Sequence, residues 1–150
     1  MAGDLYLEDL HVGQRFAAGP VAVSAAEIKS FAAAFDPQPF HLDEVAAKTT
    51  LFKGLAASGW HTAVLTMRML TEGGLPIATG VIGVGGEIAW PRPVRPGDEL
   101  RVESEVLEIT PSRSKPGQAV VKVRSTTTNQ NGEAVQILTA KLFAFARPAT

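Results

Sequence analysis

The chain of 150 residues contains no cysteine, which excludes disulfide bonds, thiolate catalysis and zinc sites with cysteine ligands. It also lacks an apolar run of about 18 residues, the length that a membrane-spanning helix needs. Its N-terminus has neither the basic nor the apolar region of a signal peptide. Charged residues make up only 19% and nearly cancel, with a net charge of −1. We therefore expect a cytoplasmic protein with no membrane contact and no nucleic-acid partner.

Apolar residues nevertheless make up 45% of the chain, which is enough for a substantial core and excludes a disordered chain. The length suits one domain. The sequence contains no internal repeat, low-complexity tract or linker. We therefore predict a single domain spanning residues 1–150.

The first helix is predicted directly after Ser24. Ser24 and Glu27 form a capping box, in which each side chain accepts a hydrogen bond from the other residue's main-chain N–H. The apolar residues that follow have helical spacing. Asp36-Pro37 ends this helix because proline disfavours a helical conformation in the residue before it.

A second helix is predicted to begin near Ser58 and to end at Gly73-Gly74. Val64, Met67 and Leu70 define one apolar stripe along it. Further apolar residues widen this stripe until most of the helix surface is apolar. We therefore predict that this helix is buried.

Strand-like segments occupy the rest of the chain. They cover residues 15–23, 78–90, 99–109, 119–129 and 134–146. Turn signals separate the last four segments, and Asn131-Gly132 is the strongest of these signals. We predict that these four segments form an antiparallel meander. Because a sheet packs one long helix most economically by curling around it, the predicted fold class is α+β.

A sheet wrapped around one helix leaves an edge strand open. Pairing two copies edge to edge would continue the sheet and protect one edge of each copy. We therefore expect a homodimer or a higher homo-oligomer.

The segment FDPQPFHLDE, residues 35–44, holds the strongest candidates for chemistry, Asp36 and His41. A histidine beside a carboxylate is a common source of a general base near neutral pH. An extended segment stiffened by prolines cannot place both residues on one helical face, but a curved one can direct both into one cavity. By local physics alone, Asp36 can equally be a helix-stop residue and His41 a turn histidine bonded to the backbone.

The neighbouring ionisable residues have simpler explanations. Asp43 and Glu44 suit the start of a short helix. His61, in the first turn of the second helix, fits a core histidine, a helix-start contact or a pocket residue. A metal site built on Asp36, His41 and Asp43 would also need His61. The spacing does not demand such a site, and we expect no metal.

Small residues mark the entrance to the second helix at Ala57-Ser58-Gly59. The unpaired N–H groups and the helix dipole there can stabilise an oxygen that gains negative charge, and glycine lets a ligand approach closely. The same residues also fit a simple N-cap serine followed by glycine. Next to an acid–base pair, an oxyanion site would complement proton transfer.

Two further features are open to more than one interpretation. The glycine-rich segment 81–87 lacks a phosphate-loop pattern, so we expect its glycines to allow close packing on the helix or a narrow ligand tunnel. Four scattered cationic residues are candidates for binding a phosphate group: Lys53, Arg68, Arg92 and Arg95.

The stretches Asp36-Pro-Gln-Pro-Phe-His41-Leu-Asp43 and Ala57-Ser58-Gly59-Trp60 resemble the hydratase motif of the MaoC-like dehydratases and (R)-specific enoyl-CoA hydratases. The stretch 87–100 resembles the strand, turn and strand that follow in that family. The likeness runs from about Val12 to Ala146. It implies the hot-dog fold, in which a curved antiparallel sheet wraps a long central helix, usually as a dimer.

The resemblance also implies an activity. Asp36 and His41 would be the catalytic pair, and the Gly59 N–H would bind the thioester carbonyl oxygen. The reaction would be the reversible addition of water to a trans-2-enoyl thioester, giving an (R)-3-hydroxyacyl thioester. The substrate would be an acyl-CoA or acyl carrier protein thioester, with no metal or redox cofactor.

Residues next to the catalytic motif are predicted to bind substrate: Gln38, Phe40, Ser58 and Trp60. Gln38 stands where the family often has asparagine, Ser58 where it commonly has histidine, and Met67 where some members have a hydroxyl residue. These departures leave the acid–base pair intact and concern substrate preference. Two alternatives remain: a hot-dog acyl-CoA thioesterase that attacks C1 instead of C3, and a non-catalytic acyl-thioester-binding partner subunit of a heteromeric dehydratase.

Overall fold

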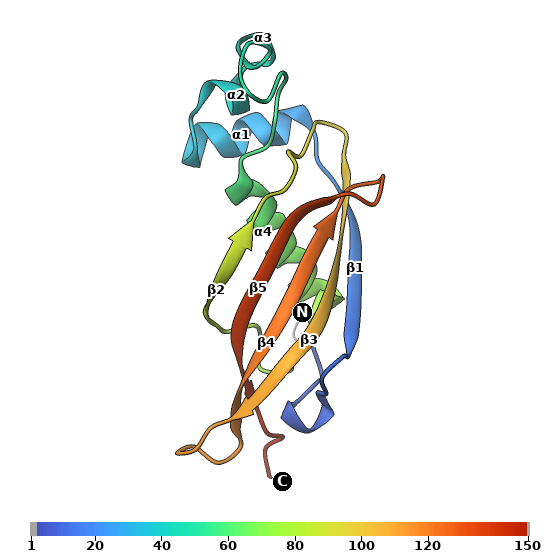
Figure 1. Cartoon of the computed structure of the whole chain (residues 1–150), viewed down its shortest axis with the longest axis vertical. Coiled ribbons are helices and arrows are strands. Elements are labelled where there is room, and N and C mark those ends of the chain that lie inside the picture. The colour runs from blue at the N-terminus through green and yellow to red at the C-terminus, as the bar shows by residue number, and fades with distance from the viewer. Residues whose placement is uncertain (1–2, 150) are drawn as a thin grey trace.

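The computed structural model of the protein describes residues 3–149 and has an α+β architecture (Figure 1). Its helical elements are η1 (Leu7–Asp9), α1 (Ala25–Phe35), α2 (Pro39–Leu42), α3 (Glu44–Ala47), α4 (Gly59–Met69) and the π-helical turn η2 (Leu70–Gly74). Its strands are β1 (Arg15–Ala22), β2 (Gly83–Ala89), β3 (Glu99–Pro111), β4 (Gln118–Thr128) and β5 (Ala134–Phe145).

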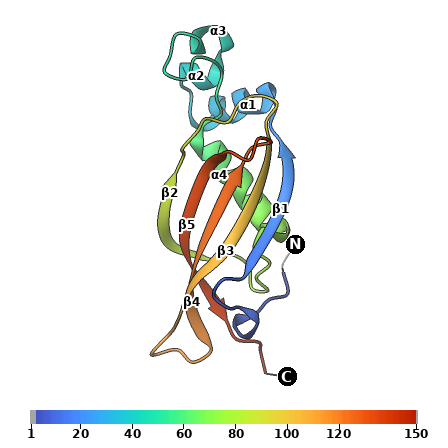
Figure 2. The same ribbon diagram turned by 45° about the vertical axis from the view of Figure 1, so that its right-hand side comes forward.

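The five strands form one antiparallel sheet in the order β1-β3-β4-β5-β2. The sheet curves around α4, and α1, α2 and α3 gather beyond one end of it (Figures 1 and 2). The predicted α+β class, with a curved antiparallel sheet around a central helix, is therefore confirmed.

The strand predictions are right for four of the five segments. The prediction for residues 78–90 needs correction. β2 begins at Gly83 instead of Ala78, because Ile77–Gly80 form a turn closed by the Gly80 N–H and the Ile77 carbonyl. The predicted four-strand meander is also wrong. β2 pairs with β5 at the far edge, so only β3, β4 and β5 form a meander.

The signals at the ends of α1 act as predicted. The Glu27 N–H donates to Ser24 Oγ, and the Ser24 N–H donates to Glu27 Oε1, each over 3.1 Å. The helix ends at Phe35, and Asp36 takes the C-cap position with a non-helical backbone.

The segment around His41 is more regular than the sequence suggested. His41 lies in the one-turn helix α2, which begins at Pro39, where the fixed φ angle of proline suits a first helical position. Asp43 then caps α3, because its side chain accepts hydrogen bonds from the N–H groups of Val45 and Ala46. The structural role predicted for Asp43 is confirmed, whereas the proline-stiffened segment expected to be extended or curved contains a helical turn at His41.

The predicted apolar stripe of the second helix faces the core only at its end, where Leu70 is 2% exposed. Val64 and Met67 are 50% and 43% exposed, whereas Thr62 and Thr66 are buried. The Thr66 hydroxyl is hydrogen-bonded to that of Thr127 on β4, over 2.7 Å. The central helix therefore contacts the sheet partly through hydroxyl groups, and one of its apolar flanks is open in the single chain.

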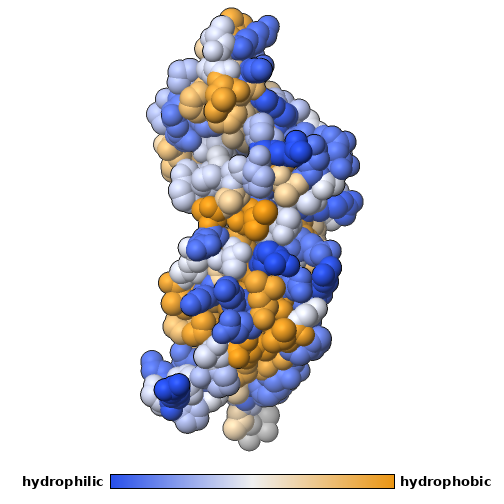
Figure 3. All heavy atoms as spheres, viewed as in Figure 1, coloured by the Kyte–Doolittle hydropathy of each residue, from blue (hydrophilic) through white to orange (hydrophobic). Residues whose placement is uncertain are grey.

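The outer face of the sheet carries charged side chains. Arg15 bridges Glu103 and Glu105, and Arg124 also pairs with Glu105. Figure 3 shows blue hydrophilic groups interspersed with orange patches over this face. These exposed ion pairs contribute little to stability, so the fold depends mainly on the buried side of the sheet.

No helix within residues 3–149 has the length and apolar character to cross a membrane.

The Thr66–Thr127 pair generates a prediction about stability. Thr66→Val or Thr127→Val alone should lower the free energy of unfolding by about 1–3 kcal/mol, because each leaves the remaining buried hydroxyl without its partner. The double variant should lose less than the sum of the two, as measured by urea unfolding. Thr126→Val, on the opposite face of β4, is the control. Strictly additive losses would show that the two hydroxyls do not depend on each other.

Candidate active site

Asp36 and His41 converge where α1 ends and α2 begins. His41 Nε2 lies 3.4 Å from Asp36 Oδ2, and the His41 side chain is only 5% exposed. The single turn of α2 brings the two side chains together across the prolines between them. The structure thus places the two predicted catalytic residues side by side in a largely buried position.

A main-chain carbonyl determines which nitrogen of His41 carries the proton. His41 Nδ1 lies 2.6 Å from the carbonyl oxygen of Ala56. A carbonyl oxygen only accepts hydrogen bonds, so Nδ1 must donate and Nε2 of the neutral ring carries a lone pair. Nε2 and the Asp36 carboxylate are then two adjacent acceptors. This arrangement suits a single water molecule, which has two protons to donate.

Two side chains hold the Asp36 carboxylate. Ser58 Oγ donates to Oδ2 over 2.7 Å, and Gln38 Nε2 donates to Oδ1. Burial on its own would raise the pKa of Asp36, but the bonds from Ser58 and Gln38 and the nearby His41 prevail and lower it. Asp36 is therefore a carboxylate at neutral pH.

The entrance of α4 offers an unpaired N–H group beside this pair. Ser58 Oγ accepts a hydrogen bond from the Trp60 N–H. The Gly59 N–H has no acceptor among residues 3–149. Trp90 covers the glycine so closely that a Cβ at position 59 would lie 2.6 Å from its ring. The Trp90 ring is fixed in turn by a 3.0 Å bond from its Nε1 to Oε1 of the fully buried Gln136.

One cavity connects His41 with the entrance of α4. It has a volume of about 310 Å³, and both His41 and Gly59 line it. Phe52, Trp90 and Arg92 also line it. A ligand in this cavity can contact the histidine and the helix entrance at the same time.

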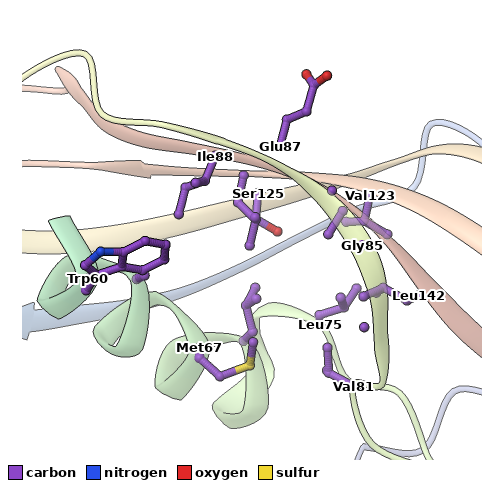
Figure 4. Close-up of a pocket in the computed structure, with 16 residues that line it drawn as sticks. Trp60, Met67, Leu75, Val81, Gly85, Glu87, Ile88, Val123, Ser125 and Leu142 are labelled. Carbon is purple, nitrogen blue, oxygen red and sulfur yellow. The ribbon is translucent and has the colours of Figure 1, made fainter.

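A second, mostly apolar cavity of about 350 Å³ lies between α4 and β2. Trp60 and Met67 reach into it from α4, and Glu87 points away from it (Figure 4). A Cβ at Gly83 or Gly85 would meet open space, so these two glycines do not pack closely on the helix. Gly86 instead packs closely on the β5 backbone and not on the helix.

The residues predicted to bind substrate occupy different positions. Gln38 and Ser58 contact Asp36, and Ser58 is fully buried. Phe40 packs edge-on against His41 at 4.6 Å between ring centroids. Trp60 is 60% exposed and touches Trp90 between the two cavities. Their proposed contacts with substrate stay predictions, but their places around the pair are now defined.

His61 belongs to the packing of the helix start. Its ring is 5% exposed and stacks on Phe31 at 4.7 Å, which fits a core histidine. Burial lowers the pKa of His61, and Glu27 only partly opposes this shift, so the ring is neutral at pH 7. In the part of the chain that the structure describes, no three His, Asp or Glu side chains are arranged to hold a metal ion.

Several residues that shape the site gave little signal in the sequence. Trp90, Gln136 and the Ala56 carbonyl act through contacts with distant segments. Among the cationic candidates, Arg95 donates its side-chain hydrogen bonds to main-chain carbonyls, whereas Arg92 pairs with Glu133. These roles become visible only in the folded structure, where residues far apart in the sequence are in contact.

The curved antiparallel sheet around α4 is that of a hot-dog protein, and the paired acid and base lie at one end of it. Residues 9–130 match the family model described as the MaoC like domain. The chain belongs to the MaoC-like dehydratase family.

Known relatives support the same assignment. A crystal structure of a MaoC-like dehydratase from Rhodospirillum rubrum is 60% identical, covers 97% of this chain and 100% of its own, and superposes with a TM-score of 0.96. The uncharacterised YdeM of Bacillus subtilis is 34% identical over 83% of this chain and 87% of its own length. An (R)-specific enoyl-CoA hydratase of Rhodospirillum rubrum is 32% identical over 72% of this chain and 74% of its own.

The contacts of Ser58 generate a prediction about pH. Ser58→Ala should raise the pKa of Asp36, because the bond from the serine favours the charged carboxylate. A lowered pKa stabilises the fold above the unfolded-state pKa of aspartate, and this contribution is lost as the pH falls through the folded value. The variant should therefore show a weaker decline of stability toward acid pH, in addition to a pH-independent loss of about 1 kcal/mol from the missing N-cap.

Urea unfolding between pH 3 and pH 7 would measure both effects. Asp36→Asn serves as the reference background, in which Ser58→Ala should change stability equally at every pH. Identical acid profiles for the wild-type protein and Ser58→Ala would contradict the role of Ser58 on the carboxylate.

Proposed function

We propose that the protein reversibly adds water to a trans-2-enoyl thioester to give an (R)-3-hydroxyacyl thioester. The observation that carries this proposal is the pair of adjacent acceptors, His41 Nε2 and Asp36 Oδ2, beside the unpaired Gly59 N–H. Hydration of a conjugated thioester needs a base for water, a donor for the carbonyl oxygen and a proton for C2. These three groups can supply all of them.

In the hydration direction, a water molecule donates one hydrogen bond to His41 Nε2 and one to Asp36, gives up one of its two protons to this pair, and attacks C3 with the resulting O–H group. As the C3–O bond forms, the electrons of the double bond move toward the thioester oxygen, where the Gly59 N–H stabilises the charge. The proton taken from water then returns to C2, and the double bond is consumed. Because one pair removes and returns the proton, both new bonds should form on the same face of the substrate.

The apolar cavity between α4 and β2 suits the acyl chain. Its lining is mainly aliphatic, and the contact between Trp60 and Trp90 marks where it approaches the cavity that contains His41. The (R)-specific hydratase relative acts on an enoyl-CoA by its name, which supports a thioester substrate. The carrier of this chain's substrate can be CoA or an acyl carrier protein.

A homodimer is part of the same proposal. The open flank of α4 exposes Trp60, Val64 and Met67 to 60%, 50% and 43%. Strand β2 is an edge strand, and Val84 on it is 53% exposed. Edge pairing of two β2 strands would bury both groups of side chains and continue the sheet.

The dimer can be tested by introducing charge on this surface. Val64→Glu combined with Val84→Lys should convert a dimer into a monomer, as measured by light scattering at micromolar concentration. Val12→Glu, at an exposed apolar residue far from β2 in the sequence, is a matched control that should stay dimeric. A wild-type protein that is monomeric at high micromolar concentration would contradict the proposal.

The activity can be tested with crotonyl-CoA by following the loss of enoyl absorbance and the release of free thiol in parallel. Asp36→Asn and His41→Ala should each lower kcat by about 10²–10⁴-fold, because each removes proton-transfer capacity. Asp43→Asn is the matched control, since asparagine caps a helix about as well as aspartate. In deuterated water, the deuterium at C2 should lie on the same face as the new hydroxyl group.

Each other outcome has a distinct meaning. Free thiol without a 3-hydroxyacyl product would indicate a thioesterase. Unchanged hydration in both Asp36→Asn and His41→Ala would refute the assigned pair. A wild-type protein that binds enoyl thioesters of several chain lengths without converting them would be a non-catalytic partner subunit.

A further inference from the structure

Arg95, in the loop between β2 and β3, holds the segment that leads into α4. Its Nη1 donates to the carbonyl oxygens of Gly54 and Leu55 over 3.0 and 3.2 Å, and its Nη2 donates to that of Phe52. No carboxylate lies within ion-pair distance of this guanidinium among the described residues. These three hydrogen bonds all go to the main chain of a single loop.

The base of Arg95 is itself fixed. Its N–H donates to Asp98 Oδ2 over 2.8 Å, and its carbonyl accepts the Asp98 N–H in a turn that contains Gly97 with a φ of 87°. Asp98 is 6% exposed, and its other oxygen accepts a hydrogen bond from Gln130 Nε2. The guanidinium is therefore presented from a rigid turn.

The loop held by Arg95 ends at the carbonyl that orients His41. The Ala56 N–H donates to the Phe40 carbonyl, and the Ala56 carbonyl accepts the bond from His41 Nδ1. The next residue, Ala57, donates its N–H to the Val94 carbonyl. Ala56 is therefore held on both sides. The carbonyl of Leu55 before it accepts a hydrogen bond from Arg95, and the N–H of Ala57 after it donates one to Val94.

The backbone within this loop is strained. Lys53 has a φ of 56°, a left-handed conformation that is unfavourable for a residue other than glycine. Such a conformation persists only where surrounding contacts enforce it. The carbonyls of the residues on either side of Lys53 are both bonded to Arg95, which supplies that enforcement.

We propose that Arg95 is a positioning residue for the acid–base pair. By holding the loop 52–55, it keeps the Ala56 carbonyl on His41 Nδ1, so that the lone pair of Nε2 faces Asp36 and the reacting water. Without this support the ring can carry its proton on Nε2 and donate it to Asp36, a state that cannot accept a proton from water. The role deepens the proposed hydration activity and rests on it.

Lysine cannot replace the arginine in this role. The guanidinium presents planar donors in a fixed fork, whereas an ammonium group is a compact donor on a flexible stem. Arg95→Lys keeps the positive charge but cannot reach three diverging carbonyls in one geometry. Arg95→Lys therefore distinguishes the proposal from a general charge effect. If only the positive charge mattered, lysine would preserve the function of Arg95.

The proposal is tested first without substrate. The protein has three histidines, so ¹⁵N-histidine spectra are simple, and His41→Ala identifies the signals of His41. In the wild-type protein the neutral His41 ring should carry its proton on Nδ1. In Arg95→Ala and Arg95→Lys a substantial fraction should carry it on Nε2. Arg124→Ala, which removes an arginine from the outer face of the sheet, should leave the spectrum unchanged.

Kinetics provide the second readout. Arg95→Ala and Arg95→Lys should lower kcat about 10–100-fold with a much smaller change in KM, as expected when a supporting contact misaligns a catalytic group. Guanidinium ion, added well below denaturing concentration, should restore part of the activity of Arg95→Ala but not that of Arg95→Lys. Thermal unfolding of each variant shows whether a loss comes from unfolded protein.

The outcomes distinguish the two proposals. A His41 ring that keeps its proton on Nδ1 in folded Arg95→Ala or Arg95→Lys overturns the positioning role. If the proton moves to Nε2 in these variants but the wild-type protein hydrates no enoyl thioester, the proposed function fails, and only the effect of Arg95 on the His41 ring remains. If the proton moves but kcat is unaffected, Arg95 orients the ring without serving catalysis, and the proposal is wrong.

Discussion

One buried hydroxyl group connects the central helix to the acid of the candidate site. Ser58 Oγ accepts a hydrogen bond from the Trp60 N–H and so caps the start of α4. The same hydroxyl group donates a hydrogen bond to the Asp36 carboxylate. The same turn leaves the Gly59 N–H without an acceptor in the described chain. The start of the helix and part of the stabilisation of the ionised carboxylate therefore depend on one side chain, which is fully buried.

Local signals in the sequence predicted most of the elements. The capping box at Ser24, the stop at Asp36-Pro37 and the turn at Asn131-Gly132 depend on residues close together in the chain, and each lies where it was expected. The resemblance of the motif between Asp36 and His41 also indicated which side chains meet. Strand order was less accessible, because the pairing of β2 with β5 is decided by how the whole sheet closes around α4.

The mistaken orientation of α4 has a physical cause. Hydropathy assigns apolar residues to the core, but Thr66 satisfies its hydroxyl on Thr127 and can be fully buried. Met67 instead faces a cavity and the open side of the sheet. Arg95 escaped prediction for a similar reason, since its partners are carbonyls about 40 residues away that no side-chain pattern marks.

The contact between Trp60 and Trp90 has an optical consequence. These are the only two tryptophans of the chain, which also has a single tyrosine. Their rings meet edge to face at 5.2 Å, one lining each of the two cavities. The intrinsic ultraviolet emission of the protein therefore originates almost entirely beside the Gly59 N–H. A ligand entering either cavity changes the surroundings of this pair, so the protein contains its own unlabelled reporter of occupancy.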